Sequence, residues 1–198
     1  MKIALADNRD SFVHNICGLL ERVSPRCQWT VVPTDVLADS PLDYDALILS
    51  PGPGLPQEMP GLMRLVEHAA GSVPMLGVCL GMQAIAIHFG AHLRQLSCPR
   101  HGHRSPLTVT DHSDPLLATL KALPSPPHVG RYHSWIVDPS TLPATLVATS
   151  RDEEGNIMSL RHRTLPLFGL QFHPESVMTD CGLDFLAAFL RLVASRLR

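Results

Sequence analysis

The chain is 198 residues long, with 45% hydrophobic and 17% charged residues, which is typical of a globular protein with a sizeable core and excludes global disorder. Its 16 Lys and Arg residues nearly balance 18 Asp and Glu residues, so the formal net charge of −2 provides no electrostatic footprint for nucleic acid or an anionic membrane. We therefore expect small-molecule or protein partners, with no nucleic acid and no membrane among them.

The beginning of the chain and the cysteines indicate a cellular compartment. Asp7 follows only a few apolar residues, which is too early for the apolar region of a signal peptide, and no apolar run reaches the roughly 18 residues of a membrane-spanning helix. The five cysteines are odd in number and show no Cys-x-x-Cys spacing, which argues against disulfides and a zinc knuckle. We expect a cytoplasmic protein.

The first half of the chain alternates short apolar runs with amphipathic stretches, the pattern of a parallel sheet covered by helices. Strands are predicted at residues 3–7, 29–32, 46–50 and 74–78, and helices at residues 11–22, 60–70 and 80–89. Ser11 is expected to cap the first helix, and Phe12 to begin its apolar stripe. Gly90 is expected to stop the third helix.

From about residue 92 the chain consists of short segments rich in Thr, Val and His, separated by Pro, which we interpret as strands that are at least partly antiparallel. These strands are predicted at residues 106–110, 131–137, 145–150, 157–161 and 167–172. A last amphipathic helix, at residues 180–197, should close the fold by packing on the sheet. Because no linker, charge block or internal repeat divides the chain, we predict one domain over residues 1–198.

The strongest local signal is Gly-Val-Cys-Leu-Gly at residues 77–81, where a buried strand passes directly into a helix. This spacing is typical of a nucleophile elbow, in which the nucleophile occupies a strained turn and the flanking glycines prevent crowding. The positive end of the following helix would favour the Cys79 thiolate. The pentapeptide alone is equally compatible with a buried structural cysteine.

A cysteine nucleophile needs an imidazole to accept its proton and a carboxylate to orient that imidazole. Of eleven histidines, His173 follows a strongly apolar strand and precedes Glu175 by two positions, with Pro174 fixing the backbone between them. A lone histidine is usually structural or solvated, but the elbow and this His-Pro-Glu segment support each other.

The third element is Ser-Pro-Gly-Pro-Gly at residues 50–54, a rigid turn that directly follows a predicted strand. Acyl chemistry needs backbone N–H groups directed at a developing oxyanion, one from the residue after the nucleophile and one from a neighbouring loop. Leu80 and Gly52 are candidates for these donors. Taken alone, the segment is also compatible with an ordinary turn.

Together these segments resemble the three signatures of class I glutamine amidotransferases, over residues 1 to about 192. Residues 7–12 (Asp-Asn-Arg-Asp-Ser-Phe) and 130–134 (Gly-Arg-Tyr-His-Ser) further resemble the amidotransferase subunits of anthranilate synthase and aminodeoxychorismate (para-aminobenzoate) synthase. The resemblance implies an α/β, three-layer, flavodoxin-like fold. Its open, mostly parallel central sheet would have helices on both faces and an additional antiparallel strand region.

The resemblance also implies roles for individual residues. Cys79 would be the nucleophile, His173 the base and acid, and Glu175 the orienting carboxylate, with backbone N–H groups of Gly52 and Leu80 forming the oxyanion hole. The glutamine pocket would be lined by Gly52, Pro53, Gly54, Gln83, Ser134 and Trp135. Tyr132 and His133 would shape the adjacent strand end.

For partners, the resemblance implies L-glutamine and a separate chorismate-binding synthase subunit, component I of anthranilate synthase or, alternatively, of aminodeoxychorismate synthase. It implies no cofactor in this chain and Mg²⁺ in the partner synthase. The other interpretations are a γ-glutamyl hydrolase, a cysteine redox sensor and a non-catalytic glutamine-sensing subunit. Gln83 and the full Pro-Gly-Pro-Gly turn argue against the hydrolase. The absence of an obvious resolving cysteine argues against the redox sensor, and the intact triad argues against the glutamine-sensing subunit.

Three departures from the family pattern leave the triad untouched and bear on the partner surface and regulation. Val-His-Asn stands at residues 13–15 where Thr-Tyr-Asn is usual, His-Gly-His at residues 101–103 where His-Gly-Lys is usual, and Trp135 where Leu is more frequent. His101 and His103 could form a metal-ligand pair on one strand face, but no nearby Cys or carboxylate completes a ligand set, so we expect no metal site.

Overall fold

A mostly parallel sheet runs through the middle of the protein, and the computed structural model describes residues 1–25 and 27–197 of the chain. In this part of the chain the main sheet has eight strands in the order β2-β1-β3-β4-β10-β9-β8-β6. The parallel strands are β1 (Lys2–Asp7), β2 (Gln28–Pro33), β3 (Ala46–Leu49), β4 (Met75–Val78) and β10 (Leu167–Leu170). The antiparallel strands are β9 (Ile157–His162), β8 (Leu146–Arg151) and β6 (Thr108–Val109).

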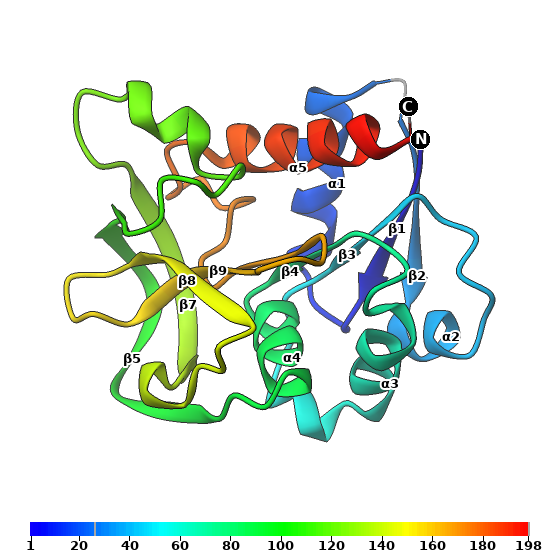
Figure 1. The fold of residues 1–198 in the computed structure, drawn as a ribbon, viewed down its shortest axis with the longest axis horizontal. Helices are drawn as coiled ribbons and strands as arrows, with labels where there is room; N and C mark the ends of the chain where they lie inside the picture. Colours follow the sequence, from blue (N-terminus) through cyan, green and yellow to red (C-terminus); the bar gives the residue numbers. More distant parts are fainter. Residues whose placement is uncertain (26, 198) are drawn as a thin grey trace.

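Helices cover both faces of the main sheet, with α1 and α5 above it and α2, α3 and α4 below it in the view of Figure 1. The helices are α1 (Val13–Val23), α2 (Thr34–Ala38), α3 (Pro60–Ala69), α4 (Leu80–His88) and α5 (Gly182–Arg196). Short 3₁₀ turns lie at η1 (Pro56–Glu58), η2 (Ala118–Ala122) and η3 (Pro139–Thr141). None of the described helices combines the length and the apolar character needed to cross a membrane.

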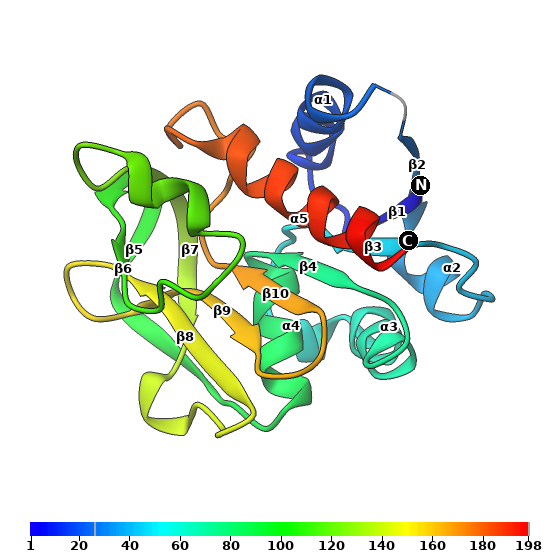
Figure 2. The ribbon, with the colours of Figure 1, turned by 45° about the horizontal axis from the view of Figure 1, so that its top comes forward.

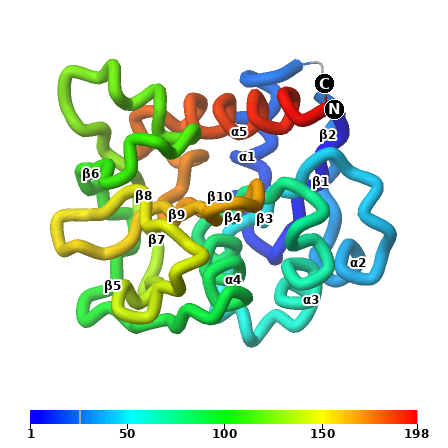
Figure 3. Tube along the Cα trace, in the orientation of Figure 1, coloured from blue at the N-terminus to red at the C-terminus, as the bar shows by residue number. Residues whose placement is uncertain are grey.

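The two helical layers explain why the central strands are apolar on both faces. Every residue of β3 and β4 is buried, as expected for parallel strands between two helical layers. In β1, Ile3 and Leu5 pack in the cluster that includes α1 and α5, whereas Ala4 packs in the cluster of α2, α3 and α4. Figure 3 shows α5 returning to lie along α1, so the predicted closing helix is confirmed.

A separate antiparallel ribbon is formed by β5 (Leu93–Pro106) and β7 (His128–Val137). Figure 2 shows this ribbon on the β8–β9 side of the molecule, away from β1 and β2. The predicted α/β architecture, with a mostly parallel sheet, helices on both faces and an antiparallel region, is therefore confirmed. Strand β10 joins the parallel and the antiparallel parts of the main sheet, because it is parallel to β4 and antiparallel to β9.

Several predicted boundaries are wrong in an informative way. The first helix begins at Val13, with Phe12 as its N-cap and no side-chain cap bond there, so Ser11 is not the cap. Instead Asp10 Oδ1 accepts a hydrogen bond of 2.7 Å from the Phe12 N–H. Two further elements were not predicted from the sequence: α2, a single five-residue helix, and β5, whose fourteen residues are mostly exposed and interrupted by two register shifts.

Candidate active site

Cys79 lies between β4 and α4 with φ 51° and ψ −102°, a left-handed conformation that is costly for a non-glycine residue. A Cβ added to Gly77 would lie 2.4 Å from the Gly81 carbonyl carbon, and one added to Gly81 would lie 2.6 Å from both Cβ and O of Leu49. The predicted nucleophile elbow geometry is therefore present, and it needs both glycines. Leu80 is the first residue of α4, so its N–H has no partner within the helix.

His173 and Glu175 form a buried pair just beyond β10, with His173 Nδ1 and Glu175 Oε1 2.6 Å apart. Because the carboxylate accepts, Nδ1 carries the proton and Nε2 is the nitrogen left for other chemistry. Nε2 is buried and has no hydrogen-bond partner among the described residues. Burial lowers the pKa of His173, but the adjacent Cys79 and Glu175 side chains outweigh burial and hold this pKa above its usual range.

The His173 ring is fixed by contacts on several sides. Phe12 and Tyr132 pack their rings edge-on against it, with centroid distances of 5.3 and 5.0 Å. The His173 N–H donates to the Gly130 carbonyl at 3.0 Å, and Thr179 Oγ1 donates to the His173 carbonyl at 2.6 Å. Phe12, expected on the helix stripe, therefore belongs to the surroundings of this imidazole.

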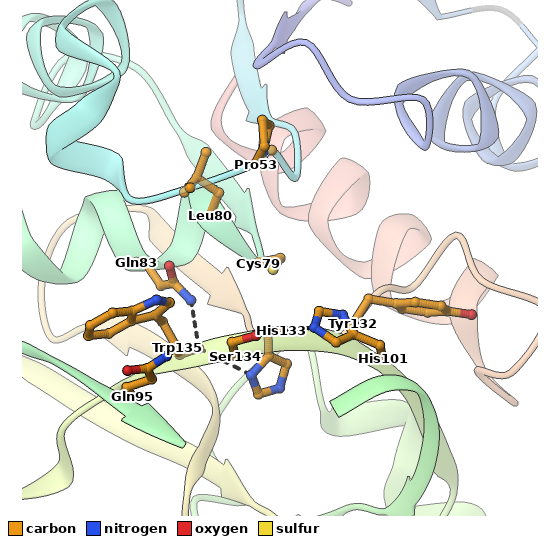
Figure 4. A pocket seen from close by; sticks show the side chains of 12 residues that line it. Pro53, Cys79, Leu80, Gln83, Gln95, His101, Tyr132, His133, Ser134 and Trp135 are labelled. Carbon is orange, nitrogen blue, oxygen red and sulfur yellow. Dashed lines mark hydrogen bonds between the residues drawn. The ribbon is translucent and has the colours of Figure 1, made fainter. Parts of the chain in front are cut away.

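A cavity of about 320 Å³ opens beside Cys79. Its lining consists of Gly52, Pro53, Gly54, Cys79, Leu80, Gln83, Gln95, His101, Tyr132, His133, Ser134 and Trp135. Figure 4 shows Gln83 and Trp135 to one side of Cys79, and His101 and Tyr132 to the other. All residues predicted for the oxyanion hole and the glutamine pocket thus meet here. His173 and Glu175 are not among the residues that line this cavity, and the His173 side chain contacts Cys79.

The Pro-Gly turn is held against the elbow. A Cβ added to Gly52 would lie 2.6 Å from Leu80 Cδ2 and 2.8 Å from Asn8 Cβ, so its backbone approaches Leu80 closely. Asn8 anchors the start of the turn, because its Nδ2 donates to the Ser50 carbonyl at 2.8 Å and its N–H donates to Ser50 Oγ at 2.9 Å. This close approach brings together on the cavity wall the two residues that are predicted to supply the oxyanion donors.

Gln83 connects the cavity to the core. Its Nε2 donates to the Trp135 carbonyl at 2.9 Å and to Gln171 Oε1 at 3.1 Å. Both amide hydrogens are therefore engaged, which leaves Oε1 of Gln83 as its acceptor for a ligand. A ligand group at this position should be a hydrogen-bond donor.

Behind the cavity, a buried ion pair supports β7. Arg131 Nη1 lies 2.8 Å from Asp152 Oδ2, and Arg131 Nε donates to His133 Nε2 at 3.2 Å. His133 Nδ1 then donates to the Trp135 carbonyl at 3.1 Å, which fixes the neutral tautomer. Burial, the Arg131 charge and the His173 imidazole lower the pKa of His133 to about 3.

The disfavoured alternative, in which His101 and His103 share one strand face, does not match the structure. His101 is opposite Tyr132 and His103 is opposite Arg131, which are neighbours on β7, because a bulge intervenes at Gly102 with φ 70°. The two histidines therefore point to opposite faces. His101 lines the cavity with Nε2 3.1 Å from Ser134 Oγ. Among the described residues, no three His, Cys, Asp or Glu side chains are grouped as a metal site.

Gln171, Gln95 and Arg131 are among the residues of this region that were not predicted from the sequence. Gln171 is fully buried next to Cys79, Gln95 lines the cavity, and Arg131 supports it from behind. A signal existed for Gln171, since an amide between Leu170 and Phe172 interrupts an otherwise apolar segment. No comparable signal existed for Gln95, because β5 shows no apolar alternation.

Comparison with known proteins places most of the chain in one family. Residues 4–193 match the family model for glutamine amidotransferase class I. The chain is 40% identical to aminodeoxychorismate synthase component 2 of Klebsiella aerogenes over 95% of this chain and 98% of that protein. It is 38% identical to anthranilate synthase component 2 of Mycobacterium tuberculosis over 96% of this chain and 82% of that protein.

A third relative, from Bacillus subtilis, is named aminodeoxychorismate/anthranilate synthase component 2 and is 36% identical over 95% of each chain. Among solved structures, a Thermoplasma acidophilum protein that is provisionally described as part of a GMP synthase matches with a TM-score of 0.85 and 26% identity over 100% of this chain and 96% of that one. The predicted family resemblance is therefore confirmed: the chain belongs to the class I glutamine amidotransferases.

Proposed function

We propose that this chain is a glutaminase subunit that hydrolyses L-glutamine at Cys79 and passes the ammonia to a separate chorismate-binding synthase subunit. The observation that carries the proposal is the position of Cys79, on a strained elbow between the His173–Glu175 pair and the cavity that contains Gln83. Family membership supports the same chemistry.

In the first half-reaction, the Cys79 thiolate attacks the γ-carboxamide carbon of glutamine and forms a tetrahedral anion. The backbone N–H groups of Gly52 and Leu80 stabilise its oxygen. The His173 imidazolium donates the Nε2 proton to the leaving nitrogen, so ammonia departs and a γ-glutamyl thioester remains. Glu175 holds Nδ1–H and thereby directs Nε2 at the reacting atoms.

In the second half-reaction, neutral His173 takes a proton from a water molecule, and the resulting hydroxide attacks the thioester carbonyl. The second tetrahedral anion occupies the same oxyanion site. Its collapse breaks the carbon–sulfur bond and releases glutamate, which loses its carboxyl proton to solvent. The Cys79 thiolate and the His173 imidazolium are restored, so the atoms and charges balance.

The pocket chemistry fits an amino acid ligand. Because both Nε2 hydrogens of Gln83 are engaged, its Oε1 can accept a hydrogen bond from the α-ammonium group of glutamine. Backbone groups of Ser134 and Trp135, with Pro53 and Gly54 across the cavity, would position the rest of the substrate.

The relatives' names support a synthase partner and do not separate two candidates. Relatives of similar identity are named component 2 of anthranilate synthase, component 2 of aminodeoxychorismate synthase, or both. We propose component I of anthranilate synthase as the partner, with component I of aminodeoxychorismate synthase as the alternative. We further propose that the chain acts as one cytoplasmic domain without a cofactor, and that Mg²⁺ is used by the partner synthase.

The decisive experiment compares Cys79→Ser with Cys98→Ser, an exposed cysteine outside the cavity. With chorismate and each of the two component I proteins, Cys79→Ser should lose glutamine-dependent synthesis and keep synthesis from ammonium salts, whereas Cys98→Ser should keep both. Glutaminase activity of Cys79→Ser above about a hundredth of the wild type would remove Cys79 from the mechanism.

The same reconstitution separates the two partners and the hydrolase alternative. We expect one component I protein to raise glutamine hydrolysis by on the order of 100-fold, because docking would fix loops at three strand ends that must agree within about an ångström. The component I protein that produces this increase shows whether the complex makes anthranilate or aminodeoxychorismate. If the chain alone turns over at full rate and neither partner changes it, the γ-glutamyl hydrolase interpretation replaces this proposal.

A further inference from the structure

Gln171 is a buried polar residue that the mechanism above does not use. It follows β10, is 0% exposed, and its N–H donates to the Met158 carbonyl at 2.8 Å. Its side chain reaches in two directions, with Oε1 3.1 Å from Gln83 Nε2 and Nε2 3.5 Å from Cys79 Sγ. A fully buried amide needs partners for its polar atoms, and here those partners are the pocket glutamine and the nucleophile.

One backbone carbonyl determines which atom of each amide donates. The Trp135 carbonyl can only accept, so the Gln83 atom next to it is Nε2. Gln83 Nε2 is also a donor towards Gln171, so the Gln171 atom that faces it is Oε1. The other Gln171 atom, next to Cys79 Sγ, is then the donor Nε2. The orientation of both amides therefore follows from the donor and acceptor roles of the atoms around them.

We propose that Gln171 is a positioning residue for the nucleophile: its Nε2–H donates to the Cys79 thiolate, and its Oε1 holds Gln83 in the orientation that binds glutamine. The inference rests on the proposed function, whose reaction gives the sulfur a negative charge at the start and at the end. A neutral thioester sulfur is a weaker acceptor, so this bond favours thiolate departure in the second half-reaction.

The charged surroundings of the sulfur make a pH profile informative. His173 is in contact with Cys79, and Glu175 acts on the sulfur through it. His101, on β5, and Tyr132, on β7, line the same cavity. His133, on β7, is also near His173, but its pKa of about 3 keeps it neutral over the useful range. Because all these groups are the same in every variant, the difference between the variants' profiles of thiol reactivity between about pH 5 and 10 reports on the donor that we assign to Gln171.

The test measures the alkylation rate of Cys79 by iodoacetamide against pH, with the modified peptide quantified by mass spectrometry. Gln171→Glu keeps the shape and an acceptor for Gln83 but removes the donor to sulfur. Gln171→Met removes both, and Gln28→Met is the matched control at an exposed position of β2. We expect the midpoint to rise by about one pH unit or more in both Gln171 variants, the size expected for a hydrogen bond to an anion, and to stay unchanged in Gln28→Met.

Kinetics with the partner synthase test the second contact. Gln171→Met should raise the KM for glutamine more than Gln171→Glu does, because only Met releases Gln83, while both should lower kcat. Wild-type alkylation midpoints in two folded Gln171 variants would overturn the proposal. The alkylation needs no glutamine, so an absence of glutaminase activity in the wild-type complex would reject the proposed function and still leave Gln171 decided.

Discussion

The two parts of the molecule that meet at Cys79 hold their residues in place by different means. The parallel part, β1 to β4, is apolar throughout its central strands, and the position of Cys79 follows from backbone strain and from glycines that leave no room for a Cβ. The antiparallel part contains a buried ion pair and a chain of side-chain hydrogen bonds from Arg131 to Trp135.

The difference indicates a division of tasks. Steric packing fixes Cys79, since an elbow built from backbone has few other conformations. Polar contacts fix the cavity wall on β7. An unpaired buried polar group is costly there, so the arrangement in which all such groups are paired is favoured. Damage to the parallel part should thus reduce turnover, whereas damage to the antiparallel part should reduce stability and substrate affinity.

The largest effect is expected where the two parts meet, at the end of β10. His173→Ala removes the proton acceptor and donor and should lower kcat in the partner complex by on the order of 10⁴-fold or more. Glu175→Gln keeps a group that can accept from Nδ1. Its kcat should therefore stay at least about tenfold higher than the kcat of His173→Ala. Steady-state glutaminase assays check this difference, and equal losses would contradict the assigned roles.

The next effect concerns stability in the antiparallel part. Arg131→Met leaves Asp152 as a buried carboxylate without its cation and should lower the free energy of unfolding by about 3–5 kcal/mol. The matched control is Arg64→Met, which breaks an exposed ion pair of 3.2 Å with Asp39 in the parallel part and should cost under about 1 kcal/mol. Denaturant titrations measure both, and similar losses would mean that burial does not distinguish the two pairs.

A smaller effect is expected in the parallel part. Gly81→Ala places a Cβ against the Leu49 backbone and should shift the elbow enough to lower kcat by on the order of 100-fold with little change in KM. Gly18→Ala in α1, where nothing lies within 4 Å, should keep kcat and raise stability by up to about 1 kcal/mol. A KM effect that exceeds the kcat effect in Gly81→Ala would reverse the division of tasks.

The smallest effect, counted per pH unit, is a pH dependence of stability of about 1.4 kcal/mol for one proton. The pKa of His133 falls from 6.5 to about 3 on folding, so between these values the unfolded chain binds more protons and the free energy of unfolding rises with pH. Above pH 6.5 this contribution is constant. His133→Asn keeps a donor to Trp135. It should lower the slope of the free energy of unfolding against pH, between pH 3 and 6.5, by the contribution of roughly one proton. Denaturant titrations at several pH values measure this slope. An unchanged slope would show that His133 titrates normally.

Much of the fold follows from local patterns, because buried parallel strands are continuous apolar runs that are easy to identify. The failures have physical causes. In β5, the bulges at residues 95–100 and around Gly102 break the alternation that marks a strand. Ser11 is a good cap by type, but the helix begins at Val13 without a side-chain cap, and the Asp10 carboxylate instead accepts from the Phe12 N–H in the turn before the helix. Such competition between neighbours depends on three-dimensional geometry.

The candidate site was predicted in part for a similar reason. Cys79, His173 and Glu175 lie in short segments whose spacing carries the chemistry, so their local sequence is informative. Phe12 and Gln171 act on His173 and Cys79 from distant parts of the chain, and their partners are defined only by folding. His101 and His103 do not share a strand face, because the bulge between them changes the face to which a side chain points.

The Trp135 carbonyl has a consequence for how this position tolerates change. It accepts from Gln83 and from His133, and it does so through the main chain, which every amino acid shares. Replacing the side chain at residue 135 therefore reshapes the cavity wall without removing the acceptor that orients both neighbours. Exchanging the indole of Trp135 for another side chain would therefore leave these two hydrogen bonds in place and change only the surface that a ligand meets. Substitutions at residue 135 can thus alter the selectivity for a ligand while the hydrogen bonds that orient Gln83 and His133 are kept.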